Sequence, residues 1–299
     1  MTSPIELVFC LHQTSSDSPY PMALAANYIS IRQRTNHPLR LHVIVDSTVE
    51  ESSLQRLRAT LKADDQLCVL HASAVPEADQ VARETPTLYT PAVVWRAWLP
   101  EYLPNLQRCL VLDCDLIACM DVHRIWSIDL NGNTLAAKLR RKPRSEAYHD
   151  WVQTAPNRYF RMGICLMDLE AIRANEAFIE DRVLFLQQTA RRRHEMGEAN
   201  LLEQSLFNRY FSDSCLALNL EVPAPDYLRG KLTERQLNQP DDHGCKPDSL
   251  GVIVDIKGWN NHSPECLHFW SALLETPWRE EAIAQFLRIR PPAPPRSGP

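Results

Sequence analysis

Two carboxylates lie two residues apart in the stretch CLVLDCDLIACMDVHRIW, residues 109–126. Asp113 and Asp115 directly follow the apolar run Cys109–Leu112, which is typical of a buried strand. A turn after Asp113 would let both carboxylates converge on one cation, and hard oxygen ligands of this kind suit Mg²⁺ or Mn²⁺. Such a cation would neutralise a diphosphate and stabilise it as a leaving group. The alternative is a pair of solvated loop aspartates, because D-x-D alone is a weak motif.

The neighbouring sequence predicts the elements that would position this pair. Apolar runs typical of strands occupy residues 6–11, 39–46, 67–71, 109–112, 135–138, 161–169 and 252–256. We predict helices at residues 22–34, 50–63, 90–103 and 197–211. Strands that alternate with helices indicate βαβ units and a parallel sheet. In open α/β sheets ligands bind beyond the carboxyl ends of the strands, and Asp113 and Asp115 occupy such a position.

The composition is ordinary for a soluble globular protein and argues against several kinds of site. Of 299 residues, 44% are hydrophobic and 23% charged, and the net charge of −5 gives no electrostatic reason to expect a nucleic-acid partner. No apolar run approaches the ~18 residues that span a bilayer, so we expect a cytoplasmic protein. The nine cysteines include no C-x-x-C pair, which argues against a zinc ribbon, and the eight glycines form no glycine-rich phosphate loop. We expect one domain over residues 1–288 and a disordered, proline-rich tail over 289–299.

Five segments, in order along the chain, resemble family 8 glycosyltransferases over most of residues 5–280. They are RTNHPLRLHVIVDSTVEES, LPEYLPNLQRCLVLDCDLIACMDVHRIWSIDL, RYFRMGICLMDLEAIR, EQSLFNRYF and LHFWSALLETPW. The resemblance implies an α/β fold of the GT-A type, with a Rossmann-like mixed sheet flanked by helices. The C-terminal part is then mostly irregular or helical, and it includes the polar segment 221–251. The resemblance also implies that a sugar is transferred with retention from a nucleotide-sugar, usually a UDP-sugar, with Mn²⁺ (or Mg²⁺) as cofactor.

The resemblance assigns the metal ligands and a supporting arginine. Asp113 and Asp115 match the two aspartate ligands of the family, and Cys114 lies between them on the donor side. His268 matches a late metal-binding histidine, and a core histidine is the alternative. Arg96 matches an arginine that supports the carboxylates or contacts donor phosphate, and a surface-helix arginine is the alternative.

Further family positions concern the two sugars and the nucleobase. Glu203 and Gln204 match an acidic–amide pair near the anomeric carbon, where either group would stabilise oxocarbenium character; a solvated charge is the alternative for Glu203. Ser205 replaces the third member of that element. Tyr20 matches a tyrosine that stacks on the nucleobase, unless it is a packing residue. Trp278 matches a tryptophan near the donor, and a buried anchor is equally consistent with its position.

The chain departs from the family pattern at several positions. Arg161 replaces the asparagine of the Y-F-N-A-G element, in which Gly163 is kept. An arginine there suits a negatively charged sugar or acceptor, and a salt bridge explains it equally well. Thr276 stands where the family has a lysine that meets the donor diphosphate. The basic run 138–144 could compensate, or could be a solvated loop, and Asp17 could replace an aspartate missing from the first loop.

Three functions remain in competition. The leading hypothesis is a metal-dependent hexosyltransferase that transfers a sugar to a glycan, protein or small-molecule acceptor, for instance in bacterial surface glycan synthesis. The second is a GT-A fold that has lost its chemistry and serves as a nucleotide-sugar binding or scaffold protein, which the Arg161 and Thr276 replacements motivate. A nucleotidyltransferase ranks last, because the loop after the first strand contains no glycine. The three arginines at 191–193 suggest at most a peripheral contact with anionic lipid.

Overall fold

The computed structural model describes residues 3–15, 18–85, 90–118, 121–140, 144–192, 202–218, 252–253 and 264–288. Asp17, the segment 221–251, the tail 289–299 and the side chain of His268 lie outside the described part, so the expectations for them stay predictions.

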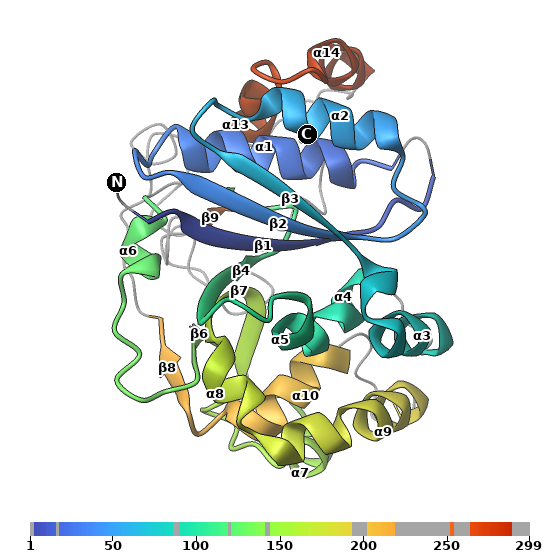
Figure 1. Ribbon diagram of the computed structural model, residues 1–299, viewed down its shortest axis with the longest axis vertical. Coiled ribbons are helices and arrows are strands. Elements are labelled where there is room, and N and C mark those ends of the chain that lie inside the picture. Colours follow the sequence, from blue (N-terminus) through green and yellow to red (C-terminus); the bar gives the residue numbers. More distant parts are fainter. Residues whose placement is uncertain are drawn as a thin grey trace, which may run out of the picture.

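A mixed sheet of seven strands forms the centre of the molecule (Figure 1). Its order is β3 (Gln66–His71), β2 (Leu39–Val45), β1 (Ile5–Leu11), β4 (Arg108–Leu112), β7 (Phe160–Asp168), β6 (Leu135–Leu139) and β8 (Cys215–Ala217). The first four strands are parallel, β7 is antiparallel to both β4 and β6, and β8 is parallel to β6. The predicted mixed α/β sheet is therefore confirmed.

Helices cover both faces of this sheet (Figure 1). One face packs against α1 (Tyr20–Arg32), α2 (Glu51–Thr60), α13 (Pro264–Leu273) and α14 (Arg279–Arg288). The other packs against α3 (Pro76–Glu84), α4 (Ala92–Trp95), α5 (Leu99–Tyr102), α8 (Leu169–Arg173), α9 (Glu176–Arg192) and α10 (Leu202–Phe211). Smaller elements are α6 (His123–Trp126), α7 (Glu146–Val152), the 3-10 turns η1 (Ala72–Ala74) and η2 (Arg96–Trp98), and a separate ladder of β5 (Ile117–Ala118) with β9 (Val252–Ile253). Within the described ranges, no helix has both the length and the apolar character that crossing a bilayer requires.

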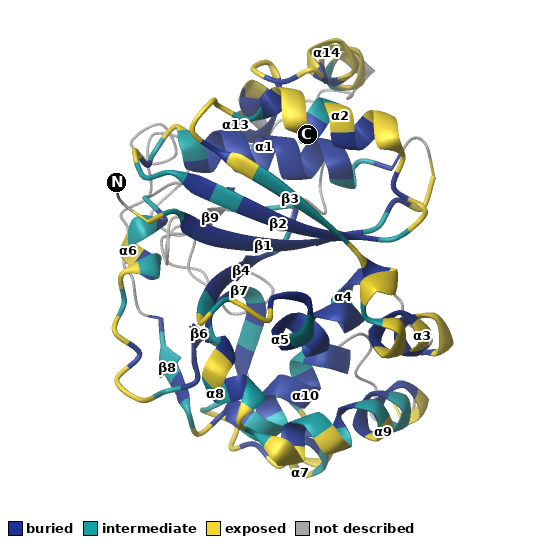
Figure 2. Cartoon of the chain, viewed as in Figure 1, coloured by how far each residue is buried: buried dark blue, intermediate teal, exposed yellow. Residues whose placement is uncertain are grey.

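The central strand β1 is buried on both faces, as its dark colour in Figure 2 shows. Leu7 and Phe9 point into the core under α1 and α2, whereas Val8 and Cys10 point into the core on the opposite face. A strand covered on both sides needs apolar residues at every position rather than at alternate ones. This explains why the sequence shows a continuous apolar run here.

The predicted helix at 90–103 is wrong as a single element. The chain forms α4, η2 and α5 in succession instead. Pro100 lies in the first turn of α5. A proline has no N–H to donate and its ring crowds the carbonyl of the fourth residue before it, here Arg96, so a continuous helix is interrupted. The bend places Arg96 in the interior, where it enters the candidate active site.

Candidate active site

The strand order reverses between β1 and β4. The chain runs outward from β1 to β2 and β3, then returns to pair with the other side of β1 as β4. Such a switch point leaves an opening at the carboxyl ends of the strands. Asp113 is the first residue after β4, and its backbone is fixed there: its N–H donates to Gly163 O at 2.9 Å, and its carbonyl accepts from Asn27 Nδ2 at 2.9 Å.

The D-x-D segment divides its side chains between solvent and core. Asp113 and Asp115 are both partly exposed, whereas Cys114 is buried and its thiol donates to Cys10 O at 3.3 Å. Both predicted ligands thus lie on the accessible side. The side chain of Cys114 is turned into the core, so only its backbone can face a bound donor.

Arg96 lies between the two acidic residues Asp113 and Glu203 and contacts both. Its side chain is only 8% exposed and forms an ion pair with Asp113 Oδ1, while its Nη1 lies 3.7 Å from Glu203 Oε1. Burial on its own would lower the pKa of Arg96, but the two carboxylates outweigh it and raise the pKa above its ordinary value. The arginine therefore remains charged and supports the carboxylates, and the surface-helix alternative is wrong.

Glu203 is buried at the start of α10, with 6% of its surface exposed. Burial raises the pKa of this carboxyl to about 7, and the attraction of Arg96 offsets only part of that effect. Glu203 is thus poised between its protonated and ionised forms near neutral pH. The interpretation of this residue as a solvated charge on a helix surface is wrong.

Gly163 allows β7 to approach the Asp113 carboxylate closely. A Cβ atom added to this glycine would lie 2.5 Å from Asp113 Oδ2, closer than side-chain carbons are found. The oxygen that is not paired with Arg96 therefore occupies the space of the missing side chain. This cradle leaves room for the carboxylate beside a bound ligand.

An amide network holds Gln204 in one orientation. Its Oε1 accepts from the Met162 N–H at 3.2 Å, and its Nε2 donates to the Tyr159 hydroxyl at 2.9 Å. That hydroxyl lies 2.9 Å from the hydroxyl of Tyr148, which lies 2.6 Å from Ser205 Oγ. The serine that replaces the third member of the family element is thus part of the network that fixes Gln204.

Comparison with known proteins now decides the class. Residues 13–221 match the model of the family described as glycosyl transferase family 8. The chain belongs to glycosyltransferase family 8. General stress protein A of Bacillus subtilis is 24% identical over an alignment of 189 residues, and the match covers 58% of this chain and 61% of that protein.

Two solved structures show the same fold. The bifunctional glycosyltransferase WbbM matches with a TM-score of 0.68 and 15% identity, over 95% of this chain and 52% of that one. The galactosyltransferase LgtC, solved in complex with donor and acceptor sugar analogues, matches with a TM-score of 0.66 and 16% identity, over 93% of this chain and 100% of LgtC. This chain thus spans about half of WbbM and about three fifths of General stress protein A. The predicted GT-A fold and the predicted membership of family 8 are confirmed.

Two positions of the family 8 pattern have structural roles near the C-terminal helices. Trp278 is buried, and the guanidinium of Arg56 lies 4.4 Å above its ring, which favours the interpretation as an anchor. Thr276 is buried too: its hydroxyl donates to Leu273 O at 2.8 Å and accepts from the Trp278 N–H at 3.1 Å. Thr276 thus closes the end of α13 and offers no positive charge to a diphosphate.

Tyr20, the predicted nucleobase-stacking residue, is half-buried at the first residue of α1.

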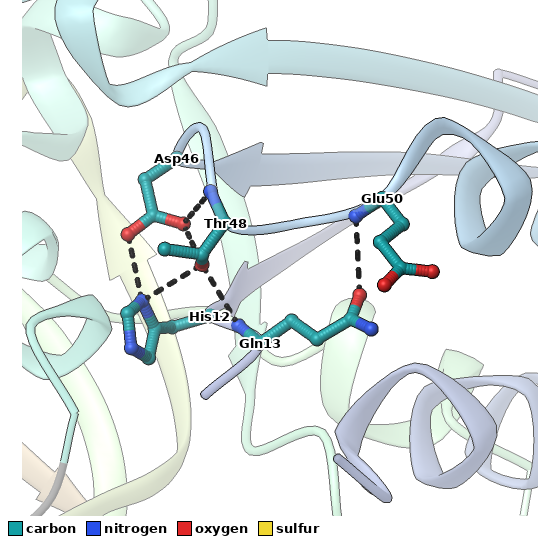
Figure 3. Close-up of polar contacts among 5 residues, drawn as sticks. All are labelled: His12, Gln13, Asp46, Thr48 and Glu50. Atoms are coloured by element: carbon teal, nitrogen blue, oxygen red, sulfur yellow. Dashed lines mark hydrogen bonds and ion pairs between the residues drawn. The ribbon is translucent and has the colours of Figure 1, made fainter. Parts of the chain in front are cut away.

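A polar cluster that no sequence motif predicts lies at the ends of β1 and β2 (Figure 3). His12 Nδ1 lies 2.6 Å from Asp46 Oδ2, and the hydroxyl of Thr48 accepts from the Gln13 N–H at 3.1 Å. Thr48 also donates its hydroxyl proton to Asp46 Oδ1. Because the carboxylate only accepts, Nδ1 must carry a proton, and Nε2 is the ring nitrogen that this pair does not use. The only signal in the sequence is that polar residues follow both apolar strands.

Two of the three predicted ligands of a divalent cation lie at the end of β4. Asp113 and Asp115 offer hard oxygen atoms on the accessible side, and Gly163 provides space for Oδ2. Among the residues that the structure describes, no three His, Cys, Asp or Glu side chains form a metal-binding group. The third predicted ligand, the side chain of His268, falls outside that part.

Proposed function

We propose that this enzyme is a metal-dependent retaining glycosyltransferase that moves a sugar from a nucleotide-sugar, most simply a UDP-hexose, to an acceptor hydroxyl. The observation that carries the proposal is the array of Asp113, Arg96 and Glu203 at the switch point, with Gly163 against the Asp113 carboxylate. The buried guanidinium of Arg96 holds two carboxylates in fixed positions at the opening of the sheet, and such an arrangement is a preorganised electrostatic site.

Asp113, Asp115 and His268 would hold Mn²⁺ or Mg²⁺. The bound cation supplies charge neutralisation for the departing nucleoside diphosphate. Arg96 keeps one Asp113 oxygen fixed, so the carboxylate needs little reorganisation when a ligand arrives. Thr276 cannot replace the family lysine in this task.

The ends of β1 and β2 suit the nucleoside of the donor. The Asp46–His12 pair fixes the imidazole through Nδ1, and Nε2 would then be the ring atom that contacts the donor. In the neutral ring this atom is an acceptor, which would pair with an imide N–H such as that of uracil. The proposal of a UDP-sugar rests on this match and on the family resemblance.

Stabilisation of positive charge at the anomeric carbon falls to Glu203 and Gln204. Retention through a covalent intermediate or by front-face attack passes in either case through an oxocarbenium-like state. Gln204 Oε1 accepts one N–H from Met162, and a carbonyl oxygen has a second lone pair for the sugar. In its ionised form, Glu203 beside Arg96 adds negative potential to the same region.

A panel of nucleotide-sugars tests the proposal. Wild-type protein with Mn²⁺ should release nucleoside diphosphate from at least one donor, and a chelator should abolish the release. Asp115→Asn should lose at least ~100-fold of this activity, whereas Asp64→Asn, an exposed aspartate between α2 and β3, should not. UDP binding without turnover on any donor would favour the scaffold function instead.

A further inference from the structure

Four cations lie on or beside the segments of β6 and β7 where their ladder shifts register, although the whole chain carries a net charge of −5. We call Lys138, Arg140, Arg144 and Arg161 the β6–β7 cation cluster; all four side chains are half-buried. Positive charges in a partly buried setting attract an anion more strongly than the same charges do in open solvent, because the effective dielectric constant is lower there.

The strand geometry holds this cluster beside the proposed sugar site. The ladder of β6 and β7 shifts register between Ala137 and Leu139, and the Arg140 N–H donates to Tyr159 O at 2.7 Å. Phe160 and Met162 both point into the core under α10, so Arg161 between them points to the opposite face. Gly163, the cradle of the Asp113 carboxylate, follows two residues later.

Arg144 connects the cluster to the network around Gln204. Its guanidinium carbon lies 5.6 Å above the ring of Tyr148, whose hydroxyl is bonded to that of Tyr159. Burial lowers the pKa of Arg144, and the charges of Arg140 and Arg161 lower it further. Arg140 and Arg161 are therefore close enough to Arg144 to repel it.

We propose that a sugar bound beside Gly163 carries a negatively charged group, a carboxylate or a phosphate, which Arg161 and the rest of the β6–β7 cation cluster recognise. Three of the four cations are arginines, whose planar fork binds carboxylate and phosphate through two parallel hydrogen bonds. The asparagine that family 8 has at this position suits neutral hydroxyls instead. The inference rests on the proposed function, and the charged group belongs to either the donor sugar or the acceptor.

Matched pairs of neutral and anionic sugars test the inference through binding, which does not depend on turnover. In the donor arm, dissociation constants of UDP-glucuronic acid and UDP-glucose are measured by calorimetry with Mn²⁺. In the acceptor arm, glucose 6-phosphate and glucuronate are compared with glucose by ligand-observed NMR with UDP present. Wild-type protein should prefer the anionic member at least ~10-fold in one arm, which identifies the source of the charge.

Substitutions separate recognition from a structural role of the arginine. Arg161→Asn, which restores the family residue, should remove most of the preference, and Arg161→Lys should retain part of it. Arg58→Asn, a matched change of an exposed arginine on α2, should leave the preference intact. The inference is overturned if both wild-type ratios are near one, or if Arg161→Asn lowers the melting temperature and leaves the ratio unchanged, as a salt bridge would require. Donor hydrolysis, measured separately, reports on the proposed function alone.

Discussion

Arg96 gives two neighbouring carboxylates different properties. Asp113 forms the direct ion pair and is 38% exposed at its side chain, whereas Glu203 is buried and lies 3.7 Å from the guanidinium. A buried charge is tolerated only when partners compensate for its lost hydration. Asp113, which is partly exposed, is therefore suited to bind a cation, and Glu203 to a role that depends on its protonation.

The raised pKa of Glu203 predicts a specific pH dependence of stability. The native state binds a proton at Glu203 up to about pH 7, whereas the unfolded chain loses it near the ordinary value of 4.5. The contribution of this group is thus fully present below that value and is lost as pH rises through about 7. Relative to Glu203→Gln, the wild-type free energy of unfolding should fall by at most about 3 kcal/mol between these limits.

Urea unfolding of the metal-free protein at pH 5, 6, 7 and 8 measures this difference. The free energy of unfolding of wild type, relative to that of Glu203→Gln, should fall from pH 5 to pH 8. A gap that stays constant with pH would show that Glu203 is ionised throughout.

Gly163 should matter for activity more than for stability. In Gly163→Ala the new Cβ would lie 2.5 Å from Asp113 Oδ2, so the carboxylate must move away from its position beside Arg96. We expect at least a ~10-fold loss of donor hydrolysis, because small displacements of site groups are costly.

Gly132 provides the matched control. It lies in a turn with φ of +79° and has open space around it. Gly132→Ala should therefore lower the stability by about 1 kcal/mol through backbone strain and leave hydrolysis unchanged. Full activity in Gly163→Ala would contradict the role of the close approach.

At the scale of elements, α10 replaces a missing strand partner of β7. The ladder of β4 and β7 begins only at Ile164, and before it Asn208 Oδ1 accepts from the Phe160 N–H at 2.8 Å while its Nδ2 donates to Phe160 O at 2.9 Å. A side-chain amide thus satisfies backbone groups that lie beyond the end of β4. The same contact brings Glu203 and Gln204, at the start of α10, to the site.

Removal of this amide should destabilise the protein strongly. Asn208→Ala leaves a buried donor and acceptor without partners, which is expected to cost about 2–4 kcal/mol in free energy of unfolding. The same change at Asn175, whose Oδ1 only caps α9 by accepting from the Phe178 N–H at 2.9 Å, should cost about 1 kcal/mol. Equal losses in urea unfolding would show that α10 is held to β7 by other contacts.

The sequence predicted the strands more accurately than the helices. The first three strands along the chain, the strand before Asp113 and β7 agree within about a residue, because each contains an apolar run. The helix at 90–103 was not divided at Pro100, and β7 was extended to Leu169. Asp168 ends β7 because its side chain caps α8 by accepting from the Ala171 N–H at 2.9 Å.

At the scale of the whole molecule, the C-terminal helices return to the N-terminal half (Figure 1). Gln33 Nε2 donates to Glu275 Oε1 at 2.6 Å, and Arg56 Nη2 donates to Pro277 O at 2.7 Å. Arg56 also lies over Trp278. These contacts join residues more than 200 positions apart, so no local pattern could predict that α13 and α14 cover α1 and α2.

The same limit applies to the site. Its members that belong to a local motif, the aspartates and the pair Glu203–Gln204, could be predicted from the sequence. The His12–Asp46 pair and the hydroxyl network of Tyr148 could not, because each joins separate elements whose proximity is set only by the topology.

Calorimetric titration of UDP into the protein tests most directly whether the D-x-D pair binds a diphosphate through a cation. Asp115→Asn is the better variant, because Asp113→Asn also removes the partner of buried Arg96. With Mn²⁺, wild type and Asp64→Asn should bind UDP with equal affinity, and Asp115→Asn should bind at least ~100-fold more weakly. If UDP bound equally well in chelator and in Mn²⁺, or equally well to Asp115→Asn and to wild type, the claim that the D-x-D pair binds the diphosphate through a cation would be contradicted.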